Sequence, residues 1–230
     1  MTLIAGIDEA GRGPCFGPMT VSIALIDSKD EAKLKEIGVK DSKEITPKGR
    51  EKLFDLVQDI IVEHRTIIVP PIEINDLMTR YTLNEIEEMK MAELIERLKK
   101  KPEVIYIDCP EKNGKKFETK VRSFFSKDMG KAKEKDLEKI KVIAENKADA
   151  NYVVVGAASI LAKVTRDREI EKLQEKFGAI GSGYPSDPNT VAFLEKYVAE
   201  HKKLPPFSRI FWANCKLVME KKDSKQQKLF

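Results

Sequence analysis

The sequence predicts an α/β fold followed by a small helical part. Short apolar runs of strand length alternate with longer segments of helical periodicity, the pattern of a sheet covered by helices. After Gly178 the loop-forming stretch GSGYPSDP introduces two more helical segments. With 230 residues, 41% of them hydrophobic, the chain can bury a sizeable core. We expect an α/β domain over 1–178, a helical part over 179–221 and a flexible polar tail over 222–230.

The apolar runs define the expected strands. Leu3–Ile7 and Met19–Ile26 are joined by a turn rich in Gly and Pro, which is short enough for an antiparallel pair. Three further runs, at 65–69, 104–107 and 140–144, have the length and β-branched content of buried strands.

Start signals define the expected helices between and after these strands. Thr46 before Pro47 is typical of an N-cap with proline in the first turn, and Thr82 with Glu85 forms a capping box. The remaining helices are expected over Lys112–Phe125, Ala157–Phe177, from Asp187-Pro188 to about His201, and through roughly Met219.

Composition excludes several classes of protein. The cysteines, Cys15, Cys109 and Cys215, are far apart and the chain has two histidines, so neither a disulfide framework nor a zinc site is expected. No apolar run approaches the roughly 18 residues of a membrane span. We therefore expect a soluble, cytoplasmic protein, and a monomer by default. The net charge of +4 is too small to establish a nucleic-acid partner on its own.

Carboxylates follow three of the expected strands. Asp8 and Glu9 close the first strand, Asp108 ends the strand at 104–107, and Asp149 follows the one at 140–144. Neighbouring strands would bring all four to one sheet edge, where two like charges at 4 Å cost about 4 kcal/mol at an effective dielectric of 20. Only Lys147 is a basic neighbour in sequence.

Divalent cations are the simplest counter-charge for such a group. An all-oxygen ligand set selects Mg²⁺ or Mn²⁺, and two ions about 3.5 to 4 Å apart would promote phosphodiester displacement. A single aspartate at a strand end also suits a turn or a helix cap, which remains the alternative for Asp108 or Asp149 alone. The adjacent pair fits that alternative less well, and the strand must end or twist if both residues are to reach one site.

Other residues suggest contacts with a ligand. Gly11-Arg12-Gly13 does not have dinucleotide-fingerprint spacing, and is either a plain turn or a backbone that approaches a sugar closely. Tyr184 lies on a loop from which it would contact a base or a ribose 2′-hydroxyl, unless the loop is only a connection. The basic residues Lys40, Lys43, Lys163, Arg166 and Arg168 face phosphates or are solvated surface charges.

Taken together, the motifs resemble one known family. IDEAGRGP, VKDSK, YIDCP, NKADANY, AASILAKVTRDR and GSGYPSDP, in this order over roughly residues 3–215, closely resemble the type 2 ribonucleases H (ribonuclease HII), above all the archaeal members. The resemblance implies a ribonuclease H-like mixed five-stranded sheet with flanking helices. It also implies Mg²⁺- or Mn²⁺-dependent cleavage of the RNA strand of RNA/DNA hybrids and at single ribonucleotides in duplex DNA, leaving 5′-phosphate and 3′-hydroxyl ends.

The resemblance also assigns roles to residues. It makes Asp8, Glu9, Asp108 and Asp149 the catalytic metal ligands. The reader of the ribose 2′-hydroxyl would consist of Gly11, Arg12, Gly13 and Tyr184, and phosphate contacts would come from Lys43, Ser159 and Lys163, with Asn84 a further candidate. Cys15 and Gly156 depart from the family pattern, and we expect them to change packing rather than activity.

Two other functions are alternatives to a ribonuclease. A catalytically silent hybrid-binding module would explain the basic residues, but its acids would weaken phosphate binding. A nucleotide-cofactor enzyme is disfavoured by the glycine spacing. The terminal Gln-Gln-Lys-Leu-Phe resembles a truncated peptide for a replication sliding clamp, and a disordered end is the equal alternative.

Overall fold

A computed structural model describes residues 2–39, 45–125 and 137–227, with only the backbone given for 222–227. Lys40 and Lys43 lie outside the described residues. The described chain divides into two compact units. The first consists of residues up to Ala10, Thr20–Ile67 and Asn84–Thr165, and the second consists of Gly11–Met19, Ile68–Leu83 and the residues from Arg166 onward.

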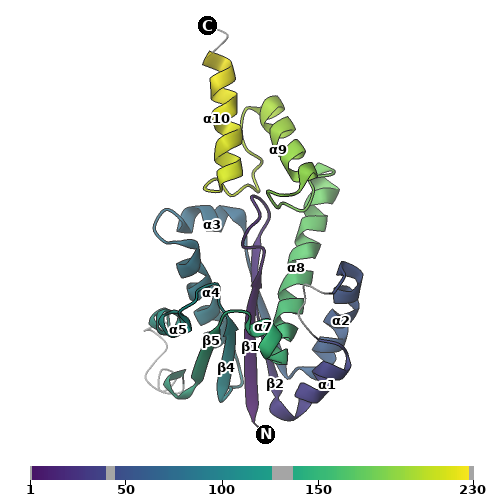
Figure 1. Cartoon of the computed structure of the whole chain (residues 1–230), viewed down its shortest axis with the longest axis vertical. Helices are drawn as coiled ribbons and strands as arrows, with labels where there is room; N and C mark the ends of the chain where they lie inside the picture. Colours follow the sequence, from purple (N-terminus) through teal and green to yellow (C-terminus); the bar gives the residue numbers. More distant parts are fainter. Residues whose placement is uncertain (1, 40–44, 126–136, 228–230) are drawn as a thin grey trace. The chain divides into compact units, whose positions relative to one another are not determined.

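Five strands of the described chain form one mixed sheet in the order β3-β2-β1-β4-β5 (Figure 1). β1 (Leu3–Ala10) and β2 (Met19–Asp27) are antiparallel, as the short turn predicts, and pair continuously until Ala10 faces Thr20. β4 (Val104–Asp108) lies parallel to β1, and β5 (Lys141–Glu145) lies parallel to β4. β3 (Glu63–Val69) is at the other edge. The predicted mixed five-stranded sheet is therefore confirmed.

The predicted helix starts are mostly confirmed. The Thr46 hydroxyl accepts a hydrogen bond from the Gly49 amide at 3.2 Å, and Asp187 accepts one from the Asn189 amide at 2.9 Å, so both act as N-caps. The helices are α1 (Glu31–Glu36), α2 (Pro47–Ile60), α3 (Pro71–Leu77), α4 (Leu83–Arg97), α5 (Gly114–Ser123), α7 (Ala148–Asn151), α8 (Val153–Phe177), α9 (Pro188–His201) and α10 (Ala213–Gln227), with a 3₁₀ turn at Ser28–Asp30.

Some helices differ from expectation. α1, α3 and α7 are too short to show a periodic pattern, so the sequence did not predict them. α8 starts at Val153, before the expected start, and α10 continues to Gln227, past its expected end near Met219. The backbone of 222–227 is therefore helical where a tail was expected. The predicted division at residue 178 and the flexibility of the tail stay predictions.

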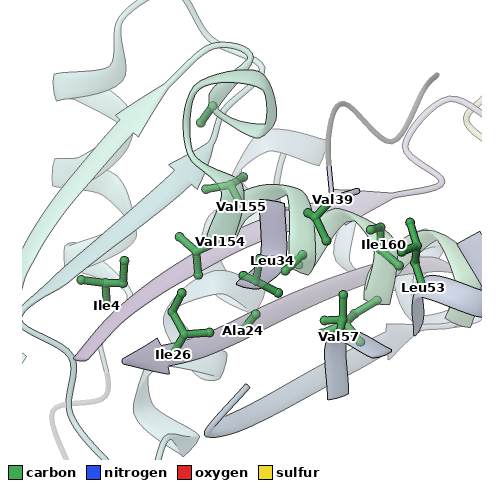
Figure 2. Close-up of a cluster of buried hydrophobic side chains, with 14 of the residues drawn as sticks. Ile4, Ala24, Ile26, Leu34, Val39, Leu53, Val57, Val154, Val155 and Ile160 are labelled. Carbon is green, nitrogen blue, oxygen red and sulfur yellow. The ribbon is translucent and has the colours of Figure 1, made fainter. Parts of the chain in front are cut away.

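The core of the first unit lies between one face of the sheet and the helices α1, α2 and α8. Figure 2 shows Ile4, Ala24 and Ile26 of the strands packed with side chains of these helices. Gly6 lies on the same face of β1 as Ile4, and a Cβ atom there would come within 2.4 Å of the Val154 carbonyl. The missing side chain thus lets α8 pack directly on β1.

The second unit has its own core, in which Cys15, Phe16 and Cys215 pack with side chains of α9 and α10. The Gly17 amide donates to the Phe207 carbonyl at 3.0 Å and the Arg209 amide donates to the Cys15 carbonyl at 2.8 Å. Residues 11–19 and 207–209 therefore hold each other in place. Cys15, a departure from the family pattern, is fully buried in this core. None of the helices described is long and apolar enough to cross a membrane.

Candidate active site

Three of the four predicted acids come together in the first unit. Carboxylate oxygens of Asp8, Asp108 and Asp149 lie within 4.8 Å of one another, and among the described residues this is the one such acidic group. Asp8 and Asp149 are buried and Asp108 is half-buried. The three aspartates therefore come together as predicted, although Asp8 lies within β1 and not at its end.

Strand alternation and two hydrogen bonds build this group, which we call the aspartate cluster. Asp8 lies on the face of β1 that carries Gly6, toward α8. At the end of β4, Asp108 accepts a hydrogen bond from the Ala148 amide at 2.9 Å, and Asn146 donates to the Cys109 carbonyl at 3.0 Å. These two hydrogen bonds hold the turn after β5 against the end of β4. As a result α7, which carries Asp149, starts beside Asp108.

Glu9 is not part of the aspartate cluster. β1 neither ends nor turns at the acidic pair, since Asp8 pairs with Ser22 and Glu9 pairs with Val21 in an unbroken register. In a continuing strand, neighbouring side chains lie on opposite faces, so Glu9 lies on the face opposite Asp8. Its backbone amide does contribute, because it donates to the Asp8 carboxylate at 2.7 Å. The role of the Glu9 side chain as a metal ligand remains a prediction.

The electrostatics of the aspartate cluster centre on Asp8. Burial and the nearby charge of Asp108 raise the pKa of Asp8 to about 7, while Lys163 and a hydrogen bond from Ser159 oppose the rise. The Lys163 ammonium donates to the Ser159 hydroxyl at 2.8 Å. Lys147 is the basic neighbour in sequence, but Lys163 is the lysine that acts on Asp8. Lys163 reaches Asp8 from α8, 155 positions along the chain, so it is distant in sequence but near in space.

In the second unit, Gly11, Arg166 and Tyr184 lie together. Gly11 has φ of +81°, and a Cβ atom there would lie 2.6 Å from the Arg166 side chain, so both conformation and space call for glycine. Arg166 donates to the Ser182 carbonyl at 2.9 Å, and its guanidinium lies 5.1 Å from the centre of the Tyr184 ring. The loops at 11–13 and 182–184 are thus joined through one arginine.

Arg166 is buried, with 4% of its surface exposed, so the expectation of a solvated or phosphate-facing charge was wrong. A second arginine, Arg209, is also fully buried. Arg209 donates to the Gly17 carbonyl at 3.0 Å and to the Arg12 carbonyl at 3.1 Å. Burial, together with the charge of Arg166, lowers the pKa of Arg209 to about 9. Through these contacts Arg166 and Arg209 hold the conformation of the Gly-Arg-Gly loop.

The Gly13 and Tyr184 positions support the predicted pairing of loop and tyrosine. A Cβ atom on Gly13 would lie 3.5 Å from the Tyr184 ring, which itself is 39% exposed and so available to a ligand. Asn84, in the first unit, donates to the Glu111 carboxylate at 2.8 Å. Lys43 lies outside the described residues.

The sequence did not predict a role for Arg209, and it did not predict that Arg166 is buried. A buried arginine has no periodic signature, because it is held by backbone carbonyls that are distant in sequence. The available signal was the stretch PPFSRIFW, in which an arginine stands among apolar residues in a segment that is too short to be a surface helix.

The chain is similar to known proteins over nearly its whole length. A family model described as Ribonuclease HII matches residues 5–215. A curated ribonuclease HII of Methanocaldococcus jannaschii is 47% identical over 99% of this chain and 98% of its own length. The crystal structure of ribonuclease H2 from Pyrococcus horikoshii has a TM-score of 0.85 at 42% identity, over 96% of this chain and 98% of that one.

A second solved structure describes an assembly. It is the complex of PCNA with ribonuclease HII from Archaeoglobus fulgidus, which has a TM-score of 0.80 and 37% identity to this chain. The match covers 94% of this chain and 96% of that one.

Proposed function

Because the chain belongs to the ribonuclease HII family and is a ribonuclease H, we propose that it cleaves the RNA strand of RNA/DNA hybrids and single ribonucleotides embedded in duplex DNA. The reaction is two-metal-ion phosphodiester hydrolysis that leaves 5′-phosphate and 3′-hydroxyl ends. The observation that carries the proposal is the aspartate cluster, whose carboxylate oxygens lie within 4.8 Å of one another. We propose that the enzyme acts as a monomer in the cytoplasm, in ribonucleotide and RNA-primer removal.

The cluster fits a divalent metal. Its donors are carboxylate oxygens, which suit Mg²⁺ or Mn²⁺ and not the softer metals. Burial, and after it the charge of Asp108, raises the pKa of Asp8 against the opposing charge of Lys163, so a divalent cation would stabilise the ionised carboxylates. When bound, the cation supplies Lewis-acid activation of the attacking water and neutralises charge on the scissile phosphate.

Each side chain of the first unit then has a task. Asp8 and Asp108 are the central ligands and Asp149 completes the aspartate cluster. Glu9, whose side chain lies outside the cluster, would join the ligand set only when the cations are bound. Ser159 orients Asp8 through its hydrogen bond, and the Lys163 ammonium, held by Ser159 at 2.8 Å, offers a positive charge to the phosphate. Lys43 is a further phosphate contact in the same proposal.

The second unit selects the substrate. Gly11, Arg12 and Gly13 present backbone to the ribose, and Tyr184 packs beside Gly13, so that a 2′-hydroxyl is recognised by groups held rigidly. Support for this role comes from the two buried arginines, which fix the loop and the tyrosine before any ligand arrives.

A single assay tests the function. A DNA duplex with one ribonucleotide, labelled on the ribonucleotide-containing strand, is incubated with the protein and Mg²⁺, Mn²⁺ or a chelator. We expect a metal-dependent nick at the ribonucleotide, with a 5′-phosphate and a 3′-hydroxyl, and no nick in an all-DNA duplex. A bound but uncut duplex in the presence of both metals would instead identify a silent hybrid-binding module.

We also propose a replication sliding clamp as a partner. The support is the relative from Archaeoglobus fulgidus, which was solved in complex with PCNA. The contact on this chain would be the terminal Gln-Gln-Lys-Leu-Phe, of which residues 228–230 lie outside the described residues. Removal of residues 226–230 is expected to abolish binding to immobilised clamp without changing cleavage of a short duplex. Unchanged clamp binding would assign the contact elsewhere.

A further inference from the structure

The second unit contains a hollow beside the Gly-Arg-Gly loop. Its volume is about 410 Å³, within the range of roughly 300 to 1,000 Å³ for ligand pockets. We call it the loop pocket, and its lining consists of Arg12, Gly13, Met78, Leu83, Phe211 and Trp212.

The lining of the loop pocket suits a ligand that has an apolar face and carries negative charge elsewhere, as a nucleic acid does. Two aromatic rings and two aliphatic side chains supply the apolar contact, and none of the described side chains that line it is acidic. The Arg209 guanidinium lies 5.0 Å from the centre of the Trp212 ring, and the Lys216 ammonium lies 5.8 Å from that of Phe211. Positive charge therefore accompanies both rings, as in nucleic-acid sites that combine aromatic and basic groups.

The walls of the loop pocket are held in place by hydrogen bonds within the second unit. Arg209 donates to the Arg12 carbonyl at 3.1 Å, which fixes one wall. The Asn75 amide donates to the Ser208 carbonyl at 2.9 Å and accepts from the Ile210 amide at 3.0 Å, which ties α3 to the segment before Phe211. A pocket held in this way loses little conformational entropy when a ligand enters.

We propose that the loop pocket receives the sugar face of a duplex nucleotide that neighbours the ribonucleotide, with Trp212 and Phe211 packed against it. The inference rests on the proposed function, because Gly13 is shared. Gly13 lines the pocket, and a Cβ atom on it would lie 3.5 Å from the Tyr184 ring, so a ribose read at Gly13 brings the next sugar of the strand toward the rings. Sugar C–H groups present the apolar surface that these rings accept, while Arg12 remains near the phosphate.

Trp212 reports on its own pocket, because it is the only tryptophan of the chain. Its fluorescence is recorded with the full chain in chelator, so that no cleavage occurs, while a labelled duplex with one ribonucleotide is added and binding is followed by anisotropy. On saturation we expect the quenching of Trp212 by acrylamide to fall at least twofold. Unchanged quenching with the duplex bound would overturn the proposal.

A variant pair tests the contribution to binding. Phe211→Ala is expected to raise KM for the single-ribonucleotide duplex about tenfold, equivalent to about 1.4 kcal/mol, with little change in kcat. Ile72→Ala removes an apolar side chain that is 75% exposed and does not line the pocket, and KM should not change. Equal KM values for the two variants would refute the proposal.

Further measurements distinguish a failure of the proposed function from a failure of the inference about the loop pocket. Met78→Ala, on the opposite wall, replaces Phe211→Ala if the latter has a lowered melting temperature, and the same rise of KM is expected. If the unmodified protein cuts no ribonucleotide-containing duplex, the proposed function fails. If it cuts normally while Trp212 stays open to acrylamide, only the inference about the loop pocket fails.

Discussion

The first unit contains a cluster of buried and half-buried aspartates, whereas the second unit contains two buried arginines, Arg166 and Arg209, that hold its loops. Burial disfavours the charged form in both places, raising the pKa of Asp8 to about 7 and lowering that of Arg209 to about 9. Both arginines donate to backbone carbonyls and face aromatic rings. Near the cluster, Lys163 is hydrogen-bonded to Ser159 and opposes the raised pKa of Asp8.

The difference teaches what each region requires to work. The arginines are held by backbone carbonyls and aromatic rings of the second unit, so the geometry of the loops does not depend on a ligand. The aspartates are only partly compensated, so the cluster should depend on an added divalent cation for its charge balance. Removing a charge should therefore matter most in the aspartate cluster, and changing side-chain geometry should matter most around the buried arginines.

The largest effect is expected from Asp8→Asn. The change keeps the shape but removes the charge that holds the cation, and several kcal/mol of charge stabilisation are lost, so cleavage at a single ribonucleotide should fall at least about 10³-fold. Duplex affinity, measured by anisotropy in chelator, should change little. The matched control is Asp76→Asn, whose side chain is 71% exposed in the second unit, and it should cut normally. Normal cleavage by Asp8→Asn would remove the aspartate cluster from the mechanism.

An intermediate effect is expected from Arg166→Lys. The charge is kept, but the planar group that reaches the Ser182 carbonyl and the Tyr184 ring is lost, so this change tests geometry. Cleavage at single ribonucleotides should weaken about tenfold, worth about 1.4 kcal/mol, and mainly through KM. Long hybrids, which offer a 2′-hydroxyl at every position, should be cut less selectively but at a similar rate.

The control for Arg166→Lys is Arg80→Lys, since Arg80 is 60% exposed and pairs with the exposed Asp76. Arg80→Lys should leave both substrates unaffected. A loss of equal size on the two substrates with Arg166→Lys would indicate general damage to the fold and would argue against a role in selecting the ribonucleotide.

The smallest effect is expected from Glu88, a buried acid of the first unit outside the aspartate cluster. Burial raises the pKa of Glu88 to about 7, against the pull of Lys120, whose ammonium lies 3.7 Å from the carboxylate. Its folded-state pKa lies above the unfolded value, so its contribution to stability is full below the unfolded pKa and is lost as pH rises to about 7.

Glu88→Gln should therefore melt several degrees higher than the unmodified protein at pH 8, and at nearly the same temperature at pH 4. Calorimetry in chelator measures this difference. Added Mg²⁺ should leave the difference unchanged, because Glu88 is not part of the cluster. If the difference in melting temperature were largest at pH 4, the pKa of Glu88 would not be raised by folding.

Local features of the fold were predictable from the sequence. Strand runs, proline-led helix starts and aspartates at strand ends depend on neighbours within a few residues, and Thr46, Asp187 and Asp108 all act at the element ends where the sequence puts them. Lys163 and Arg209 were not predictable in their roles, because their contacts join segments far apart in the chain.

Glu9 shows a subtler limit. The sequence shows two adjacent acids, but whether they share a site depends on whether the strand continues, and this is decided by the pairing of Glu9 with Val21 on β2. The short helices α3 and α7 were also missed, because one or two turns carry no periodic signal.

The register of β1 with β2 has a consequence for how such an enzyme can change. The two strands pair without interruption until Ala10 faces Thr20, so residues 11–19 form an insertion whose length does not affect the position of Asp8. A segment grafted between these two residues would leave this register unchanged, but it would have to bring its own partner for residues 207–209, because the two segments hold each other in place. With the roles proposed for the two units, substrate preference would be exchanged together with both segments, while the aspartates that are proposed to hold the metal stay in place.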